Sequence, residues 1–495
     1  MTSPQRVPEQ FRVREAYGVR IGGREQPSMS GLTRSVFSPA TSLVLTTVAE
    51  GGQTDVDAAV EAARSGVIAW RRTSWQERSA VLHAVADKLA SEAERWAWLD
   101  VQDAGIPISG ARRDVANAVT YLRYFASLCV ELRGSSVDVG TGGLSTSIRE
   151  PFGVVGRIVP FNHPLQFAAQ AIAAPLAAGN AVVLKPAEQT PVSALHLAEL
   201  FDGLIPDGVV NVIPGGADVG AAIVGHPGVP RIGFTGSVLT GRHVMRQAAE
   251  HIKEVSLELG GKNPLLILPD ADLDVAVKLA LIGMNLQRTA GQSCGSTSRI
   301  YVPSAMAAEF AARLGEAVGA LVLGDPGDEQ TDVGPLAYAE HRDRVVSMID
   351  QAVAEGARLV TGGGRRTDLG QGYYVEPAVL DQVTDEMTVA SEEVFGPVIA
   401  ILTYDSVDDA VERANALPLG LTANIVTRDL DAAIDLAHRL EAGFVWVNGR
   451  GQRPFGAPFG GYKLSGIGRE NSIDELLSYT QLKNINISGH QEATA

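Results

Sequence analysis

The chain has 495 residues, of which 45% are hydrophobic and 20% charged, and its formal net charge is -16. These values are typical of a globular protein with about three domains. The acidic balance disfavours non-specific binding to nucleic acid or to an anionic membrane. Two cysteines, Cys129 and Cys294, are too few for a four-thiolate site, so we expect no metal. Without an apolar signal-peptide core, the N-terminal segment favours a cytoplasmic chain with free thiols.

The first part of the chain is predicted to form short strands and then helices. Residues up to about Gly52 read as irregular chain or short strands. A helix is predicted from Thr54, where Thr54 and Asp57 form a capping pattern ahead of apolar residues at helical spacing. A second amphipathic helix follows over residues 81–89.

From Gly153 onward, short apolar runs alternate with helical patterns. The runs are GVVGRIV, AVVLK, VVNVI, RIGF and PLLIL. Strands that are apolar throughout and joined by helices predict a parallel sheet covered on both faces. Dinucleotides commonly bind at the C-terminal edge of such a sheet. A second αβ series is expected from about Leu259 to about Trp446.

Two segments are expected to project from this body as strands. One is residues 134–149, GSSVDVGTGGLSTSIR, which is polar and alternating. The other is residues 476–487, LLSYTQLKNINI. The most apolar stretch, residues 168–184, contains Pro175 and Gly179, which favour a buried helix, a turn and a strand over a membrane span.

Cys294 is the first candidate for chemistry. Its context, GQSCGSTSR, is small and polar, which leaves the sulfur approachable. A nucleophilic cysteine needs thiolate character from a base, a cation or backbone dipoles. A buried, inert cysteine is the alternative interpretation.

Two further residues are candidates for acid–base and oxyanion chemistry. Glu258, in LELGGKNP, follows an apolar run and could act as a general base toward water, or it could pair with Lys262. Asn162, in PFNHP, is fixed between two prolines, and its amide could donate to an oxyanion without titrating. A turn-forming asparagine is the alternative.

Residues that could grip a nucleotide also follow predicted strands. Lys185 and Glu188 lie in KPAE at the end of AVVLK, where ribose-binding groups are expected. Ser237, in FTGSVLTG, could cap a helix whose first amides hold a phosphate. Glu393 and Phe395, in SEEVFGPV, could hold a ribose and an adjacent ring.

Taken together, these motifs resemble the aldehyde dehydrogenase superfamily from about Phe37 to Lys483. The ordered set is PFGVVGRIVPFNHP, LKPAE, FTGS, LELGGKNP, GQSC, EEVFGPV and PFGGYKLSGIGRE. The resemblance implies Cys294 as nucleophile, Glu258 as base, and Asn162 with the Cys294 amide as oxyanion donors. Glu470, in GRE, matches a position implicated in proton relay, with a surface charge as the alternative. The implied NAD contacts are Phe161, Lys185, Glu188, Gly236, Ser237, Gly260, Glu393 and Phe395.

The resemblance implies an α/β fold with two Rossmann-like, doubly wound αβ domains and a small β element for bridging and oligomerisation. The expected divisions are a dinucleotide-binding domain (1–128 and 150–259), a catalytic domain (260–447), the bridging element (129–149 and 476–495) and an entrance loop with its connection (448–475). An exposed arm invites pairing between subunits, so a homodimer or homotetramer is expected.

The sequence departs from the family pattern near the nucleophile. Phe161 stands where the family usually has Trp, Thr289 where it has Asn, and Gly295 follows the cysteine. These changes are expected to alter the wall of the aldehyde pocket. The pocket residues expected are His163, Phe167, Arg288, Ser293, Gly295, Arg450, Arg453 and Phe459.

Three of these pocket residues are arginines, which favour a substrate with a carboxylate or another anionic group. Structural ion pairs or subunit contacts are the alternative roles for Arg288, Arg450 and Arg453. His163, Phe167 and Phe459 could instead line a pocket for an aromatic aldehyde.

The predicted function is NAD-dependent oxidation of a small-molecule aldehyde to its acid through a cysteine thioester. The nearest alternative is a CoA-acylating dehydrogenase of the same fold, which typically lacks the glutamate base that Glu258 would supply. An alternative of another class is a noncatalytic dinucleotide-binding scaffold, which the presence of all three catalytic residue types disfavours.

Overall fold

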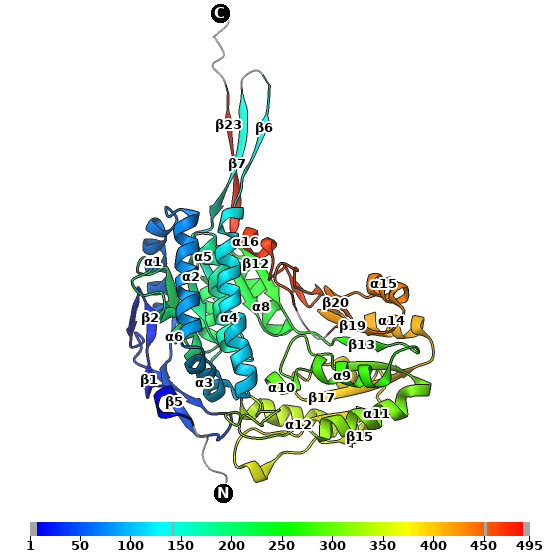
Figure 1. Ribbon diagram of the computed structural model, residues 1–495. Coiled ribbons are helices and arrows are strands. Elements are labelled where there is room, and N and C mark those ends of the chain that lie inside the picture. The colour runs from blue at the N-terminus through cyan, green and yellow to red at the C-terminus, as the bar shows by residue number, and fades with distance from the viewer. Residues whose placement is uncertain (1–6, 141–142, 450–452, 489–495) are drawn as a thin grey trace, which may run out of the picture.

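The computed structural model describes residues 7–140, 143–449 and 453–488. It has two α/β units side by side and a narrow arm that extends away from the first (Figure 1). This arrangement confirms the predicted fold class of two Rossmann-like αβ units with a small β element. No helix within the described ranges is long and apolar enough to cross a membrane.

The first unit is built on an eight-stranded sheet with the order β22-β12-β11-β8-β9-β10-β2-β3. Its central strands pair in parallel, as the apolar runs predicted. The strands are β2 (Val19–Ile21), β3 (Arg24–Gln26), β8 (Val154–Ile158), β9 (Ala181–Lys185), β10 (Val210–Val212), β11 (Arg231–Thr235), β12 (Glu254–Glu258) and β22 (Gly466–Ile467).

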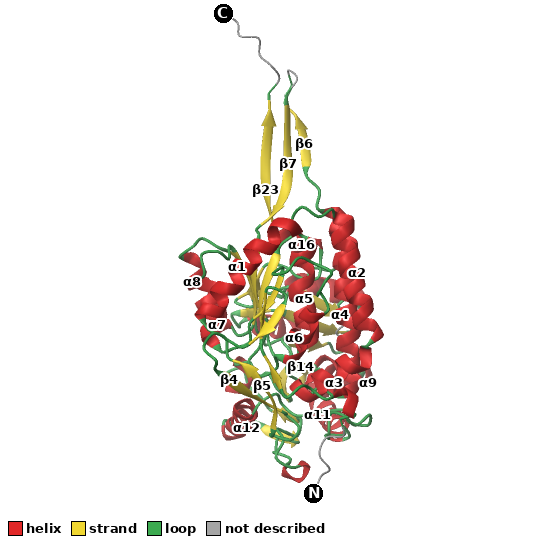
Figure 2. Ribbon diagram, turned by 90° about the vertical axis from the view of Figure 1, so that its left-hand side faces the viewer, coloured by secondary structure: helices red, strands yellow, loops and turns green. Residues whose placement is uncertain are grey.

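Helices cover both faces of this sheet (Figure 2). One face carries α1 (Gln53–Trp70), α7 (Ala217–Gly225) and α8 (Val238–Ala249). The other carries α5 (Pro164–Ala177) and α6 (Val192–Glu199), with α2 (Trp75–Ser91), α3 (Ala93–Ala104) and α4 (Ile108–Leu128) packed behind them. The stretch 168–184 is a buried helix followed by a buried strand, as predicted.

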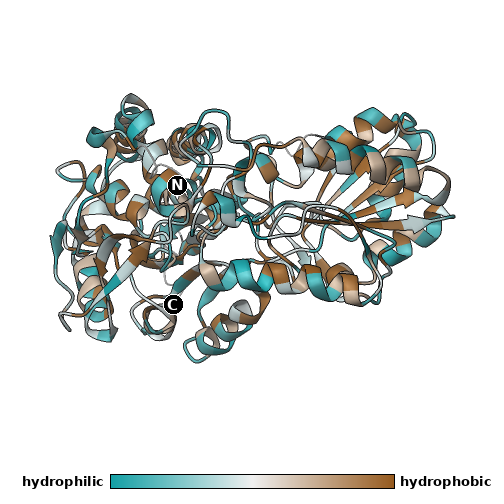
Figure 3. Cartoon of the chain, turned by 90° about the horizontal axis from the view of Figure 1, so that it is seen from below, coloured by the Kyte–Doolittle hydropathy of each residue, from teal (hydrophilic) through white to brown (hydrophobic). Residues whose placement is uncertain are grey.

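The second unit has a seven-stranded sheet with the order β15-β16-β17-β14-β13-β19-β20, which is parallel except at β15. The strands are β13 (Pro264–Ile267), β14 (Arg299–Pro303), β15 (Arg358–Thr361), β16 (Ala378–Asp381), β17 (Val398–Tyr404), β19 (Thr422–Val426) and β20 (Phe444–Val447). The helices are α9 (Leu273–Gly283), α10 (Leu286–Thr289), α11 (Ser304–Gly319), α12 (Ala339–Ala354), α13 (Thr388–Ser391), α14 (Val407–Asn415) and α15 (Leu430–Arg439). Seen from below, apolar strands lie between helices that turn polar surfaces outward (Figure 3).

The arm is a three-stranded antiparallel sheet of β6 (Ser135–Asp138), β7 (Leu144–Pro151) and β23 (Thr480–Ile487). Both predicted projecting segments therefore form strands, with one correction. Residues 476–478 belong to α16 (Ile473–Ser478), because Ser472 caps that helix through the Asp474 amide, and β23 starts at Thr480.

The start of α1 also differs from the prediction. The helix begins at Gln53, and the Asp55 carboxylate accepts the Gly52 amide at 2.9 Å, so Thr54 and Asp57 do not form the cap. The remaining elements are short. They are β1 (Ala16–Tyr17), β4 (Thr33–Phe37), β5 (Val44–Ala49), β18 (Leu419–Gly420), β21 (Tyr462–Lys463) and 3-10 turns at Glu9–Phe11, Cys129–Glu131 and Thr367–Leu369.

Candidate active site

A cavity of about 310 Å³ brings together residues that follow β8, β11 and β12 of the first sheet and residues of the second unit. Because these strands are parallel, their carboxyl ends meet at one edge, which is where αβ folds bind ligands. The lining residues are Pro160, Phe161, Asn162, Phe167, Thr235, Gly236, Ser237, Glu258, Leu259, Gly260, Cys294, Tyr338, His341, Arg344, Glu393 and Phe395.

Cys294 reaches this cavity from the loop after α10 and is partly exposed. The Asn263 amide shapes the loop, because its Nδ2 donates to the Cys294 carbonyl at 2.8 Å and to the Ser296 carbonyl at 2.9 Å. Burial raises the pKa of the Cys294 thiol, and the Arg453 guanidinium opposes that rise. Sequence reasoning missed Asn263, although it lies in the same LELGGKNP motif as Glu258.

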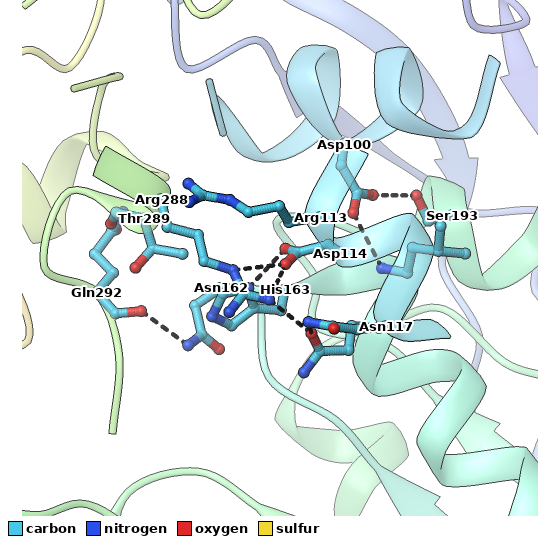
Figure 4. A network of polar contacts seen from close by, with 12 residues as sticks. Asp100, Arg113, Asp114, Asn117, Asn162, His163, Ser193, Arg288, Thr289 and Gln292 are labelled. Atoms are coloured by element: carbon cyan, nitrogen blue, oxygen red, sulfur yellow. Dashed lines mark hydrogen bonds and ion pairs between the residues drawn. The ribbon is translucent and has the colours of Figure 1, made fainter. Parts of the chain in front are cut away.

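Asn162 lines the same cavity, with its side chain nearly fully buried. Its Nδ2 donates to the Gln292 carbonyl at 2.8 Å, which fixes the amide orientation because only the NH₂ group can face a carbonyl (Figure 4). The second N–H of that group makes no hydrogen bond to a described residue. Asn162 therefore has a free donor beside the loop of the nucleophile, because its bonding partner Gln292 precedes Cys294 by two positions.

Glu258 ends β12, is 6% exposed, and has an Oε1 atom without a hydrogen-bond partner in the described part of the chain. Burial and the nearby Glu470 carboxylate raise the pKa of Glu258 well above its usual value, while Arg453 and Arg469 oppose the rise. Within the same ranges Glu258 forms no ion pair with Lys262, so the alternative structural role is wrong. An unpartnered buried carboxyl of raised pKa is typical of a functional group.

Glu470 is also buried, which rules out the alternative of a surface charge. Its carboxylate accepts Gln170 Nε2 at 2.6 Å and pairs with Arg157 Nη2 at 3.4 Å. Since its charge acts on the pKa of Glu258, the two carboxyl groups are neighbours.

The cavity also offers a cradle for a dinucleotide. Ser237 caps α8 by accepting the Thr240 amide at 3.2 Å, so the first amides of this helix can face an anion, as predicted. A Cβ atom on Gly260 would overlap the Glu393 carboxylate, and one on Gly236 would crowd the Phe234 ring. Glycine at both positions therefore keeps the cavity open, which fits a bound dinucleotide.

An aromatic group closes the other side of the cavity. The ring centroids of Phe161 and Phe395 are 5.7 Å apart, and those of Phe161 and Tyr338 are 5.5 Å apart. Phe395 has a φ of 55°, an uncommon conformation for a bulky residue. The Phe395 carbonyl oxygen lies 2.7 Å from His341 Nε2, and this hydrogen bond fixes its position. Tyr338 and His341, at the start of α12, were missed because no local motif marks them.

Lys185 and Glu188 lie at the end of β9, as predicted, but neither lines the cavity itself. Lys185 Nζ donates to the Pro186 carbonyl at 3.1 Å, and burial lowers its pKa to about 8. Glu188 pairs with Arg34 at 3.2 Å, and Arg34 also pairs with Glu50. Arg34 is a further residue that the motifs did not indicate.

The expected pocket residues divide into separate groups. Arg288 donates to Asp114 and to Gln166, so for this residue a structural ion pair is present, and Asp114 also contacts His163 Nδ1 at 2.7 Å (Figure 4). Arg450 lies outside the described residues. Arg453 stacks on Phe459, with the guanidinium carbon 3.8 Å from the ring centroid.

The other expected pocket residues lie close to the nucleophile. Ser293 and Gly295 flank Cys294, and Phe167 lines the cavity. Over the ranges 7–140, 143–449 and 453–488 no group of three or more His, Cys, Asp or Glu side chains could hold a metal ion.

Comparison with known proteins agrees with this geometry. The model of the aldehyde dehydrogenase family matches residues 27–485. The aldehyde dehydrogenase tropH of Talaromyces stipitatus is 41% identical over 478 residues, which cover 94% of this chain and 92% of the relative. The NAD+ complex of an aldehyde dehydrogenase from Bacillus cereus is 39% identical, with a TM-score of 0.93 and coverage of 97% of this chain and 98% of that one.

A betaine aldehyde dehydrogenase from Staphylococcus aureus in complex with NAD+ is 35% identical, with a TM-score of 0.93 and coverage of 97% and 96%. The chain therefore belongs to the aldehyde dehydrogenase family. It is an NAD-dependent aldehyde dehydrogenase, and NAD is its cofactor.

Proposed function

We propose that this enzyme oxidises an aldehyde to its carboxylic acid through a thioester on Cys294. The observation that carries the proposal is the cavity itself, in which a reachable thiol, an amide donor and an unpartnered buried carboxyl line one space. Asn162, Glu258 and Cys294 come from segments far apart in the sequence, so their convergence is a property of the fold.

The first half of the reaction depends on Cys294 and Asn162. The Cys294 thiolate attacks the aldehyde carbon and leaves a negative charge on the aldehyde oxygen. The free N–H of Asn162 Nδ2 and the Cys294 backbone amide donate to that oxygen, and losing one such donor costs about 3 to 4 kcal/mol. Bound NAD supplies the hydride acceptor for conversion of the adduct to the thioester.

The second half depends on Glu258. Its buried carboxylate takes a proton from water, the resulting hydroxide attacks the thioester carbon, and the acid leaves Cys294. Burial makes the Glu258 carboxylate a stronger base, because a raised pKa means that the carboxylate binds a proton more tightly. Glu470 is proposed to pass the proton onward, supported by its burial beside Glu258.

We expect free acid as the product, with no need for CoA. Purified enzyme, NAD and an aldehyde panel should give equal amounts of NADH and carboxylic acid, measured by absorbance and chromatography. A requirement for CoA with acyl-CoA as product would favour the acylating alternative instead. No NADH from any aldehyde would favour the scaffold alternative.

We expect NAD to be preferred over NADP without absolute exclusion. Glu188 is proposed to accept the adenosine ribose hydroxyls, and a 2′-phosphate would place negative charge beside it, with repulsion of up to about 4 kcal/mol before screening. Arg34, which pairs with Glu188 at 3.2 Å, reduces that repulsion. In Glu188→Gln the ratio of kcat/KM for NAD to that for NADP should fall by about tenfold, which corresponds to about 1.4 kcal/mol.

The matched control for this prediction is Glu250→Gln, because Glu250 is an exposed carboxylate at the opposite end of α8 from Ser237. This variant should keep the wild-type cofactor ratio. Comparable kcat/KM values for the two cofactors in the wild-type enzyme would contradict the role of Glu188.

We also propose that the arm pairs subunits into a homodimer or homotetramer. Its outer strands have free edges and exposed apolar side chains, which invite pairing with another sheet. Those side chains are Val137, Val139, Leu144, Ile148, Leu482, Ile485 and Ile487. A reducing cytoplasm is the proposed location, since both cysteines are free thiols.

A further inference from the structure

Three arginines lie at α10 and at the Cys294 loop that follows it. Arg453 is the innermost of them. Its charge lowers the pKa of the Cys294 thiol against the effect of burial, and its Nη2 is 2.9 Å from the position that a Cβ on Gly295 would take. Among the described residues no carboxylate forms an ion pair with Arg453, so its charge is available to a ligand.

Arg288 lies on the nearby α10 with its side chain 25% exposed. Nε and Nη2 face the Asp114 carboxylate, while Nη1 makes no hydrogen bond to a described residue. The charges of both Arg288 and Arg453 act on the pKa of His163, so both arginines lie on the same side of the site as this ring. Arg288 thus has a structural ion pair on one edge and free donors on the other.

Arg113, on α4, is the outermost of the three. Its Nη2 donates to the Gln287 carbonyl at 3.1 Å, and its exposed side chain runs beside that of Arg288 (Figure 4). It forms no ion pair with a described carboxylate. Two arginines side by side, one of them without an ion pair to a described acid, concentrate positive charge at this point.

The charges in this cluster do not balance. The contacting acid is Asp114, which is fully buried and shared by Arg288 and His163. Burial opposes its ionisation, but Arg288 and His163 hold the pKa of Asp114 below the usual value, so it remains a carboxylate. Burial lowers the pKa of His163, so this ring is neutral at pH 7. Arg113 and Arg288 thus share the single carboxylate of Asp114, while Arg453 acts on the buried Glu258 carboxyl, so three guanidinium groups face two acids.

We infer that Arg113, Arg288 and Arg453 form a subsite for a carboxylate on the far end of the substrate, so that the preferred aldehydes are semialdehydes of dicarboxylic acids. The inference rests on the proposed aldehyde oxidation at Cys294. Guanidinium groups stay charged at every working pH and bind carboxylates with two parallel hydrogen bonds. Arg453, whose Nη2 lies beside Gly295, connects the subsite to the loop of the nucleophile.

Polar neighbours support the same substrate class. Asn117 and Gln166 extend the cluster, with Asn117 Nδ2 donating to Gln166 Oε1 at 2.9 Å and Arg288 Nη2 donating to the same oxygen at 2.8 Å. An uncharged alkyl chain would displace water from these groups without replacing its hydrogen bonds, which costs affinity. The oxygens of a substrate carboxylate would accept hydrogen bonds from these groups in place of the displaced water.

The test compares glutaric semialdehyde with pentanal, an uncharged aldehyde of the same chain length, in wild type, Arg113→Gln and Arg453→Gln. The measured quantity is the ratio of the two kcat/KM values, because loss of Arg453 also affects Cys294 and therefore both substrates. Wild type should favour the semialdehyde, and the ratio should fall by about tenfold in each variant, the loss expected for one charge-assisted hydrogen bond. Added salt should reduce the wild-type ratio as well.

Arg112→Gln is the matched control, since Arg112 is the neighbour of Arg113 on α4 but its guanidinium pairs with Glu94 and Glu329 at the outer surface. This variant should keep the wild-type ratio, and melting temperatures will show whether each variant is folded. Equal kcat/KM values for the two aldehydes in wild type, or a ratio unchanged in both Arg113→Gln and Arg453→Gln, overturns the subsite. If wild type oxidises neither aldehyde nor any other, the proposed function fails instead.

Discussion

Replacing Cys294 with alanine is expected to abolish aldehyde oxidation while NAD binding persists. Without the sulfur no covalent adduct forms, and a trigonal, neutral aldehyde gives up hydride poorly. Loss of a catalytic nucleophile typically lowers turnover by at least about 10⁴-fold. The dinucleotide cradle at Gly236, Ser237 and Glu393 is untouched, so titration with NAD should give an unchanged Kd. Steady-state NADH formation and fluorescence titration measure the two quantities.

Cys129→Ala is the matched control for this experiment. Cys129 is buried, its sulfur donates to the Phe125 carbonyl, and burial raises its pKa to about 11. Its replacement should leave turnover unchanged, and iodoacetamide should label Cys294 in preference to Cys129, since the thiolate is the reactive form. Turnover near the wild-type value in Cys294→Ala would exclude the covalent mechanism.

The central strands and the core of the site could be predicted because each depends on a short stretch of chain. The runs around β8, β9, β11 and β13 are mostly apolar, apart from Arg157, Lys185 and Arg231, which is the pattern of strands buried on both faces. Asn162, Glu258 and Cys294 were found because each lies in its own motif. Only the family resemblance predicted that these three residues share one site, because separate motifs say nothing about the distances between their residues.

Other features depend on contacts between distant segments, which local patterns do not contain. The partner of Arg288 is Asp114, 174 positions away, so the sequence left open whether Arg288 is structural or binds substrate. His341 supports Phe395 through a backbone carbonyl 54 positions away, and no side-chain motif marks such a bond. The predicted α1 cap was wrong for a local reason, because Asp55, two positions before Asp57, caps the helix through the Gly52 amide.

The site also shows why the two carboxyl groups near Cys294 differ from ordinary glutamates. Glu470 accepts a hydrogen bond from Gln170 and pairs with Arg157, so its carboxyl group has polar partners. Glu258 has a buried oxygen without a partner and a charged neighbour, both of which favour its protonated form. A buried carboxyl of raised pKa beside a second buried carboxyl group is typical of a functional site.

Glu258→Gln is expected to slow thioester hydrolysis more than thioester formation. Glutamine keeps the shape of the side chain but cannot accept a proton from water, and loss of a general base typically costs about 10² to 10⁴-fold. Rapid mixing with NAD and aldehyde should therefore give a burst of NADH followed by slow turnover. Glu254→Gln, on the exposed start of the same strand β12, is the matched control and should show wild-type kinetics.

The pH dependence provides a second measurement of the same role. Only the deprotonated form of Glu258 can accept a proton, and its pKa is raised by burial and by Glu470. The wild-type hydrolysis rate should therefore rise as pH increases through that raised pKa, whereas the slow rate of Glu258→Gln should lose this rise. Hydrolysis that is unaffected in Glu258→Gln, or that keeps the same pH profile, would exclude Glu258 as the base, and strong stimulation of the variant by CoA would favour acyl transfer to a thiol over transfer to water.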